Sequence, residues 1–211
     1  MNFRKTHSPI TKPGETAGVR VGVLALQGDV SEHVDGFARA LQAMGLLENS
    51  HISLVRHAEE IEDLDVLAIP GGESTTISRL IDKNRMREPI LSFEGGIFAT
   101  CAGMVLMATD VDDPRVNCLG LIDLTVDRNA FGRQRESFEA DLEIKGLDSP
   151  YHAVFIRAPV ATESGAGVEI LSRIDQGIVG VHCGKHFALA FHPELGNDPR
   201  IHILFLERLG F

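Results

Sequence analysis

The sequence has little of several features that define whole classes of protein. It contains only three cysteines, Cys101, Cys118 and Cys183, and none of them form a C-x-x-C pair. An odd number at these spacings argues against a disulfide framework and against a tetrahedral zinc site. The cysteines therefore favour a reducing compartment, and we expect a cytoplasmic protein without a metal ion.

Excess basic charge and long apolar runs are also lacking. Lys and Arg number 20 against 30 acidic residues, so the formal net charge is −10. Proteins that bind nucleic acids need clustered Lys and Arg on the surface that meets the phosphates, so we expect no nucleic-acid partner. No apolar stretch reaches the roughly 20 residues of a membrane span, and the first residues contain no apolar signal segment. We therefore expect neither a membrane anchor nor a secretory signal.

What the sequence does contain is typical of a globular protein. Hydrophobic residues make up 44% of its 211 residues and charged residues 24%, which allows a substantial core. Residues 1–18 are polar and rich in Pro, Gly and Thr, so we expect a disordered N-terminal extension or tag. We expect residues 19–211 to form a single domain.

Strands and helices are predicted to alternate in the first half of the chain. Apolar runs typical of buried strands occupy 19–26, 52–56, 63–70 and 96–100. Helical spacing of apolar residues predicts helices over 30–45, from about 74 to 81, and over 102–109, with hydroxyls of the 73–76 segment capping the second. This alternation predicts a three-layer α/β fold, in which helices cover both faces of a largely parallel open sheet.

The second half is predicted to be richer in strands. Short strand patterns separated by turn residues occur at 119–129, 137–144, 153–160, 168–174, 177–184 and 186–195. We expect these to form a more antiparallel extension of the same sheet. The closing segment, 200–211, has the pattern of an amphipathic helix.

The first candidate for chemistry is Cys101. A buried strand ends directly at this cysteine and is followed by Ala102, Gly103 and a predicted helix, the arrangement of a nucleophile elbow. Such a turn exposes the sulfur at the carboxyl edge of the sheet and leaves the N–H of Ala102 free to donate to an oxyanion. A small buried hydrophobic side chain is the alternative for an isolated cysteine, but the flanking pattern favours the nucleophile.

The second candidate is the triplet His192-Pro193-Glu194. Residues two apart in an extended chain face the same side, so both side chains can reach one site. Histidine is a suitable general base at neutral pH, and a carboxylate can orient it. The triplet could equally be a solvated turn, and its weight comes from the presence of Cys101.

The third candidate is the loop Pro70-Gly71-Gly72-Glu73-Ser74, which follows a buried strand. Its glycines permit positive φ, and the N–H of Gly72 is suited to face developing negative charge. An ordinary strand-to-helix turn is the alternative reading. The three loops together supply oxyanion donors, a nucleophile, a base and an orienting acid, the set that acyl transfer through a thioester needs.

The motifs PGGEST, TCAGM and FHPEL, in this order, resemble those of the class I (triad) glutamine amidotransferases, whose fold is flavodoxin-like. LALQGDVSEH, RNAFGRQ, SFEADL and FIRAP are similar to segments of the glutaminase subunits of pyridoxal phosphate synthase. The resemblance extends from about Val19 to the end of the chain. It implies that Cys101, His192 and Glu194 form a catalytic triad and that the amides of Gly72 and Ala102 form the oxyanion hole.

The resemblance also implies a binding site for L-glutamine. Its residues would be Gly72, Glu73, Ser74, Arg128, Ile156 and Arg157. An arginine can bind the α-carboxylate of glutamine in a bidentate fork. The sequence departs from the family at Ala99 and in the segment VHCGKH, and we assign no chemistry to His182, Cys183 or Cys118.

The activity implied is hydrolysis of glutamine to glutamate and ammonia through a γ-glutamyl thioester, without a cofactor. The ammonia would pass to a synthase subunit that makes pyridoxal 5'-phosphate, within a large hetero-oligomer. A glutaminase of another pathway, such as imidazole glycerol phosphate synthesis, is one alternative, and a stand-alone peptidase or γ-glutamyl hydrolase is a second. A catalytically silent binding or regulatory subunit is a third, although the intact Cys101, His192 and Glu194 argue against it.

Overall fold

The computed structural model describes residues 18–128, 130–131 and 137–211. The expected N-terminal extension lies outside the described residues apart from Gly18. Part of the RNAFGRQ motif, residue 129 and residues 132–134, also lies outside them.

A ten-stranded sheet forms the centre of the molecule. Its strands are β1 (Arg20–Leu24), β2 (His51–Val55), β3 (Val66–Ile69), β4 (Gly96–Thr100), β5 (Ala108–Val111), β6 (Ile122–Asp127), β9 (Val160–Ser164), β10 (Glu169–Ile174), β11 (Gly177–Cys183) and β12 (His186–Leu189). The order is β2-β1-β3-β4-β12-β11-β9-β6-β5, and β10 pairs with β11 off this path. Strands β1 to β4 and β12 run parallel to one another, whereas β11 pairs antiparallel with β12, β9 and β10. This arrangement confirms the predicted α/β class, a largely parallel sheet with an antiparallel extension.

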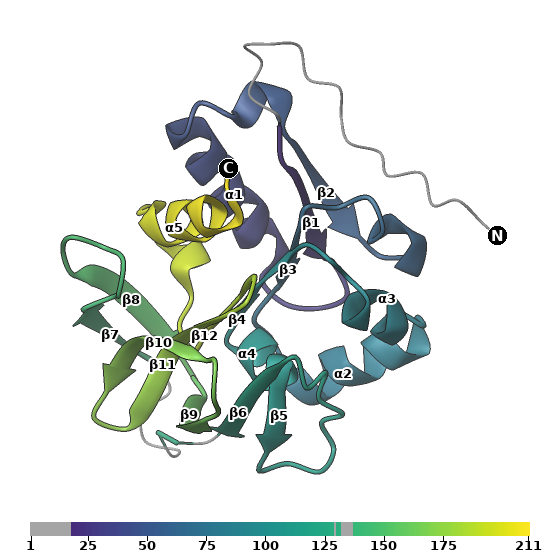
Figure 1. The fold of residues 1–211 in the computed structure, drawn as a ribbon. Coiled ribbons are helices and arrows are strands. Elements are labelled where there is room, and N and C mark those ends of the chain that lie inside the picture. The colour runs from purple at the N-terminus through teal and green to yellow at the C-terminus, as the bar shows by residue number, and fades with distance from the viewer. Residues whose placement is uncertain (1–17, 129, 132–136) are drawn as a thin grey trace.

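Helices cover both faces of the parallel part. They are α1 (Val30–Ala43), α2 (Ser74–Lys83), α3 (Arg87–Leu91), α4 (Ala102–Met107) and α5 (Arg200–Leu209), with short 3-10 turns η1 (Leu47–Asn49), η2 (Ala58–Glu60) and η3 (Pro193–Leu195). Helices α1 and α5 lie together on one face, and α2, α3 and α4 lie on the opposite face (Figure 1). Within the described ranges, none of the helices combines the length and apolar character needed to cross a bilayer.

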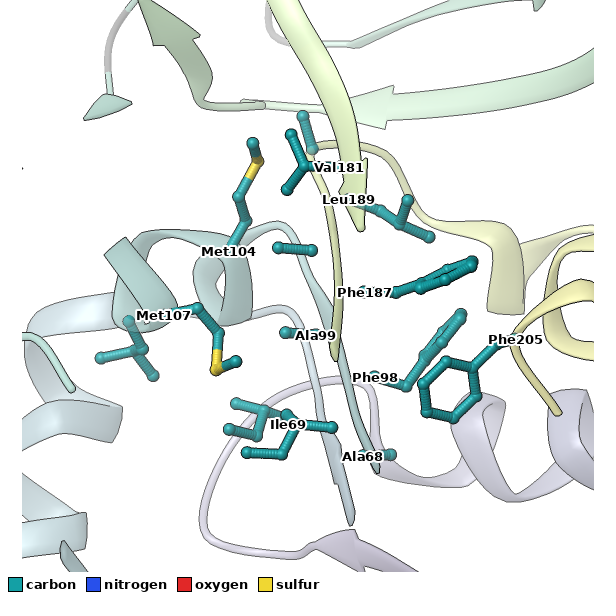
Figure 2. Close-up of a cluster of buried hydrophobic side chains, with 14 of the residues drawn as sticks. Ala68, Ile69, Phe98, Ala99, Met104, Met107, Val181, Phe187, Leu189 and Phe205 are labelled. Carbon is teal, nitrogen blue, oxygen red and sulfur yellow. The ribbon is translucent and has the colours of Figure 1, made fainter. Parts of the chain in front are cut away.

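The core around β4 and β12 holds these layers together. Phe98 of β4 and Phe187 of β12 lie side by side and contact Phe205 of α5, with ring centroids 5.2 Å from Phe205 in both cases. Met104 and Met107 of α4 fill the other side of the strands (Figure 2). All five side chains are fully buried, so the position of β4, and of the residue that follows it, is fixed from both faces.

Two expectations for the second half are wrong. The expected strand 153–160 is two strands, β8 (Tyr151–Ile156) and β9, because Arg157 has a left-handed φ of 43° and Pro159 cannot donate a ladder hydrogen bond. Among the described residues, β8 pairs with β7 (Ser137–Leu142) alone in a separate two-stranded antiparallel sheet, and neither strand extends the main sheet.

Two local expectations also need correction. The helix after Cys101 ends at Met107 rather than near Thr109, because Ala108 begins β5, which pairs with β6, and the Thr109 hydroxyl donates to the Leu124 carbonyl. Helix α2 is capped by a carboxylate rather than by hydroxyls. Glu73 is its N-cap, and its side chain accepts hydrogen bonds from the N–H groups of Thr75 and Thr76.

Candidate active site

Cys101 stands at the turn between β4 and α4. Its backbone has φ 49° and ψ −104°, which is a strained conformation for a residue with a side chain and costs about 1–3 kcal/mol. The turn is held by the hydrogen bond from the Cys101 N–H to the Leu189 carbonyl of β12, at 2.7 Å. Gly103 allows the tight packing of the helix, since a Cβ there would lie 2.4 Å from the Ile69 carbonyl oxygen. The predicted elbow is therefore present, and only 7% of Cys101 is exposed.

His192 and Glu194 converge on this turn from the segment after β12. The Nδ1 atom of His192 lies 2.7 Å from Oε1 of Glu194, and the Glu194 side chain is fully buried. The two residues are not in an extended chain, as the sequence suggested, because the 3-10 turn η3 begins at Pro193. The turn brings the carboxylate to Nδ1 of the imidazole ring.

The electrostatics of this group favour a charged histidine. Burial opposes a positive charge on His192, but interactions with Cys101 and Glu194 outweigh it and raise the pKa of His192 to about 10. Burial likewise opposes the charge of Glu194, yet interactions with His33 and His192 keep the pKa of this carboxyl below its ordinary range. The imidazolium and the buried carboxylate thus stabilise each other.

Cys101 and His192, the expected nucleophile and base, form no hydrogen bond with each other. The Sγ atom of Cys101 donates to the Ile156 carbonyl at 3.8 Å. The Nε2 atom of His192 has no hydrogen-bond partner among the described residues. This nitrogen is therefore free to exchange a proton with a substrate bound at the sulfur.

A cavity of about 420 Å³ opens over Cys101 at the carboxyl edge of the sheet. It brings together all of the predicted site residues except Glu194, which lies behind His192. The residues from the prediction that line it are Gly72, Glu73, Ser74, Cys101, Ala102, Arg128, Ile156, Arg157 and His192. Gln27, Gly28, Asp29, Val105 and Pro159 line it too and were not predicted.

The Gly71-Gly72 loop is held against the segment after β1. Gly28 has φ 107°, and a Cβ there would lie only 1.7 Å from the Gly71 carbonyl oxygen. The N–H of Glu73 donates to Oε1 of Gln27 at 2.8 Å. These contacts explain why the segment Gln27-Gly28-Asp29 belongs to the site although the sequence pattern indicated only the end of a strand.

The two arginines of the cavity differ in their ionic partners. Arg128 forms ion pairs with Glu73 and with Asp113. Burial opposes the charge on Glu73, but hydrogen bonds from Thr75 and Thr76 lower its pKa to about 2. Arg157 forms no ion pair with any residue in the part of the chain that the structure describes. A negatively charged ligand therefore meets one neutralised and one available guanidinium group.

A layer of polar residues behind the triad was missed. His33 and Thr100 contact Glu194, and Arg39 donates to the carbonyl oxygens of Glu194 and Gly196. Helical spacing could have predicted that His33 is buried, because it lies one turn from Val30 and from Phe37 on the apolar side of α1. A histidine on such a face is buried and needs a polar partner.

Asp29, His192 and Glu194 also place three possible metal ligands within 4.8 Å of one another. Oδ2 of Asp29 lies 3.5 Å from Nδ1 of His192. The same Nδ1 atom forms the 2.7 Å hydrogen bond with Oε1 of Glu194. A cation could bind there only by breaking that bond, so the geometry favours an acid–base pair over a metal centre.

Comparisons with known proteins agree on one family. Residues 23–210 match the model of the SNO glutamine amidotransferase family. The chain is 64% identical over 193 residues, 91% of its length, to the pyridoxal 5'-phosphate synthase subunit PdxT of Methanoregula boonei, all of which is covered. It is 63% identical over 192 residues, 91% of its length, to the PdxT subunit of Methanosphaerula palustris, of which 98% is covered.

A solved structure described as a glutamine amidotransferase is also similar. It has a TM-score of 0.79 and 44% sequence identity, and the match covers 90% of this chain and 99% of that one. A putative GMP synthase subunit from Thermoplasma acidophilum, with a TM-score of 0.59, matches 93% of this chain and 94% of that one at 14% identity and shares the fold.

Proposed function

The chain belongs to the SNO glutamine amidotransferase family, and from this premise we propose that it is the glutaminase subunit of a pyridoxal 5'-phosphate synthase. The observation that carries the proposal is that Cys101 and His192 line the 420 Å³ cavity together while Glu194 holds His192 from behind. The names of its relatives at more than 60% identity favour this pathway over imidazole glycerol phosphate synthesis.

The reaction starts when the Cys101 thiolate attacks the side-chain carboxamide carbon of glutamine. The tetrahedral oxyanion accepts hydrogen bonds from the amides of Gly72 and Ala102, and one such donor typically contributes about 3 kcal/mol. Ala102 is the first residue of α4, so its N–H has no acceptor within the helix. Gly72 has φ 147°, a conformation that suits glycine and places its peptide beside the cavity.

His192 moves the protons. As an imidazolium it donates from Nε2 to the nitrogen of the departing ammonia, which leaves the γ-glutamyl thioester on Cys101. The neutral ring then takes a proton from water, and the hydroxide attacks the thioester carbon to release glutamate and the thiolate. Glu194 holds Nδ1 throughout, so Nε2 stays directed toward the sulfur.

Glutamine is held by the remaining residues of the cavity. We assign its α-carboxylate to Arg157, the arginine that is free of carboxylate partners, with Arg128 beside it. Glu73, Ser74 and Ile156 complete the pocket, in which the Glu73 carboxylate offers an acceptor near the α-ammonium group. None of these steps needs a bound cofactor.

The ammonia then passes to a synthase subunit. The relatives are named as subunits of a pyridoxal 5'-phosphate synthase, which implies such a partner for them. We expect the two subunits to form a hetero-oligomer. We also expect it in the cytoplasm, because the odd cysteine count predicts a reducing compartment. A stand-alone hydrolase would release ammonia without a partner. A catalytically silent subunit would function without the thiol of Cys101.

The test is ammonia release from glutamine by the purified chain, alone and with a pyridoxal 5'-phosphate synthase subunit, beside a Cys101→Ala variant. We expect turnover that increases with the partner and is abolished in the variant. Equal activity with and without the partner would favour a stand-alone hydrolase. No turnover in either mixture would contradict the proposal.

A further inference from the structure

A second histidine lies directly beneath the triad. His33 of α1 is fully buried, and its Nε2 atom lies 3.0 Å from Oγ1 of Thr100 and 3.4 Å from Oε1 of Glu194. His33 is the last residue of the LALQGDVSEH segment, and the proposed reaction does not use it. Its distance from Glu194 in sequence, 161 residues, means that only the fold brings the two together.

The hydrogen of the His33 ring has one reasonable position. Nε2 faces a carboxylate oxygen and a hydroxyl, so it must carry the hydrogen and donate, because two lone pairs in contact would repel. The Thr100 hydroxyl can then donate onward to Oε1 of Glu194, at 3.5 Å. His33, Thr100 and His192 thus all direct donors toward the same oxygen of Glu194.

That convergence decides how the carboxylate is oriented. Oε1 accepts from His192 at 2.7 Å, whereas Oε2 has no hydrogen-bond partner in the described part of the chain. A fully buried carboxylate is costly to hold unless donors surround it. With the donors on one side, rotation of the carboxyl group away from His192 loses every hydrogen bond.

The backbone of the same turn is also held from α1. Arg39 donates from Nη2 to the carbonyl oxygens of Glu194 and Gly196, at 3.1 and 2.8 Å. Thr100 directly precedes the nucleophile Cys101. Helix α1 therefore ties the turn that carries the orienting acid to the strand that carries the nucleophile.

We propose that His33 is a positioning residue for the catalytic base, which it holds through Glu194. The inference rests on the proposed glutaminase function, because a positioned base matters only if His192 transfers protons. His33 does not reach the cavity and contacts no substrate. Its effect is on the orientation of His192 relative to Cys101.

The test compares His33→Leu, which removes the donor at similar volume, with His33→Gln, which restores an N–H at the position of Nε2. The matched control is His202→Leu on α5. His202 is buried in the same core, and its ring centroid lies 4.7 Å from that of Phe98, which His33 also contacts. Neither of its ring nitrogens forms a hydrogen bond within the described residues.

Each variant is measured as the full chain with its synthase partner, for kcat, for KM and for the rate of Cys101 alkylation by iodoacetamide. We expect His33→Leu to lower kcat about tenfold or more, a part of the 10²–10⁴ that a positioned base contributes, with KM for glutamine within about twofold. Alkylation should slow in parallel. His33→Gln should recover most of both rates, and His202→Leu should retain them.

Equal losses in His33→Leu and His202→Leu, or a change in KM alone, would overturn the proposal. If His33→Leu does not fold, Thr100→Val removes the intermediate hydroxyl at constant volume and must show the same loss of kcat. Inactivity of the unmodified chain would contradict the glutaminase function instead. The alkylation rates would then decide on His33 by themselves, because they need no substrate.

Discussion

At the scale of single residues, the charge on His192 bears on the reaction proposed for Cys101. The imidazole is buried, which disfavours a charge, but Cys101 and Glu194 together raise its pKa to about 10 from an ordinary value of 6.5. The resting site therefore holds an imidazolium beside the sulfur at neutral pH. The imidazolium carries the proton that the proposed reaction gives to the departing ammonia.

This charge state can be observed directly. We expect the His192 ring to titrate near pH 10 in an NMR titration of the labelled protein and to titrate at clearly lower pH in Cys101→Ala, because the interaction with the sulfur is lost. Since the folded value lies above the ordinary one, the stabilisation is complete below pH 6.5 and is lost as the pH rises through about 10. Identical titrations of the two proteins would contradict the pairing of Cys101 with His192.

At the scale of elements, one glutamate joins several parts of the second half. Glu169 of β10 accepts from Lys145, from His182 of β11 and from Arg208 of α5, at distances of 2.7 to 2.9 Å. These donors, Lys145 first, outweigh burial and lower the pKa of Glu169 to about 2. His182, which the sequence left without a role, is thus part of a network that attaches the C-terminal helix to the antiparallel strands.

Removal of this carboxylate should loosen the attachment. We expect Glu169→Gln to lower the free energy of unfolding at pH 7 by about 1 kcal/mol, or the melting temperature by about 2–4 °C, because exposed ion pairs contribute little singly and more as a network. The difference from the unmodified chain should shrink as the pH falls from 4.5 through about 2, where Glu169 itself becomes protonated.

The control for this prediction is Glu163→Gln on β9. Glu163 is likewise a strand glutamate, with an exposed side chain, and we expect its substitution to change the melting temperature by less than about 1 °C. A thermal melt series between pH 2 and 7 measures both variants. An equal effect of the two substitutions would show that the network does not stabilise the fold.

At the scale of the whole molecule, the cavity is formed by segments from both halves of the chain. Gly72 and Cys101 come from the first half, and Ile156, Arg157 and His192 from the second. A ligand that bridges them can bind only the folded chain. Its binding free energy therefore adds to the stability of the entire domain.

Glutamine should stabilise a variant that cannot consume it. We expect Cys101→Ala at a glutamine concentration of 100 Kd to gain about 2.7 kcal/mol, hence about 5 °C or more in melting temperature. Adding Arg157→Ala should remove most of the shift, because this arginine is the available cation of the cavity. Adding Arg173→Ala, at an exposed position of β10, should retain it. Loss of the shift in both double variants would contradict the assignment of Arg157.

The sequence by itself determined the class of the fold and the position of the nucleophile turn. Buried parallel strands are continuous apolar runs, and β1, β3 and β4 appear as such in the sequence. The elbow at Cys101 is also local, since a strand, a cysteine and small residues follow one another directly. The roles assigned to His192, Glu194 and the glutamine pocket came from motifs and stay predictions, although all of these residues except Glu194 line one cavity.

The tertiary structure alone decided which residues stand behind that site. Thr100 and Glu194, 94 residues apart, meet His33 beneath the triad, and Arg128 meets Glu73 across 55 residues. The break at Arg157, which separates β8 from the main sheet, likewise could not be predicted from the pattern of apolar residues. Apolar periodicity reports whether a residue faces the core, but a hydrogen bond depends on a partner that the chain brings near only after the sheet has formed.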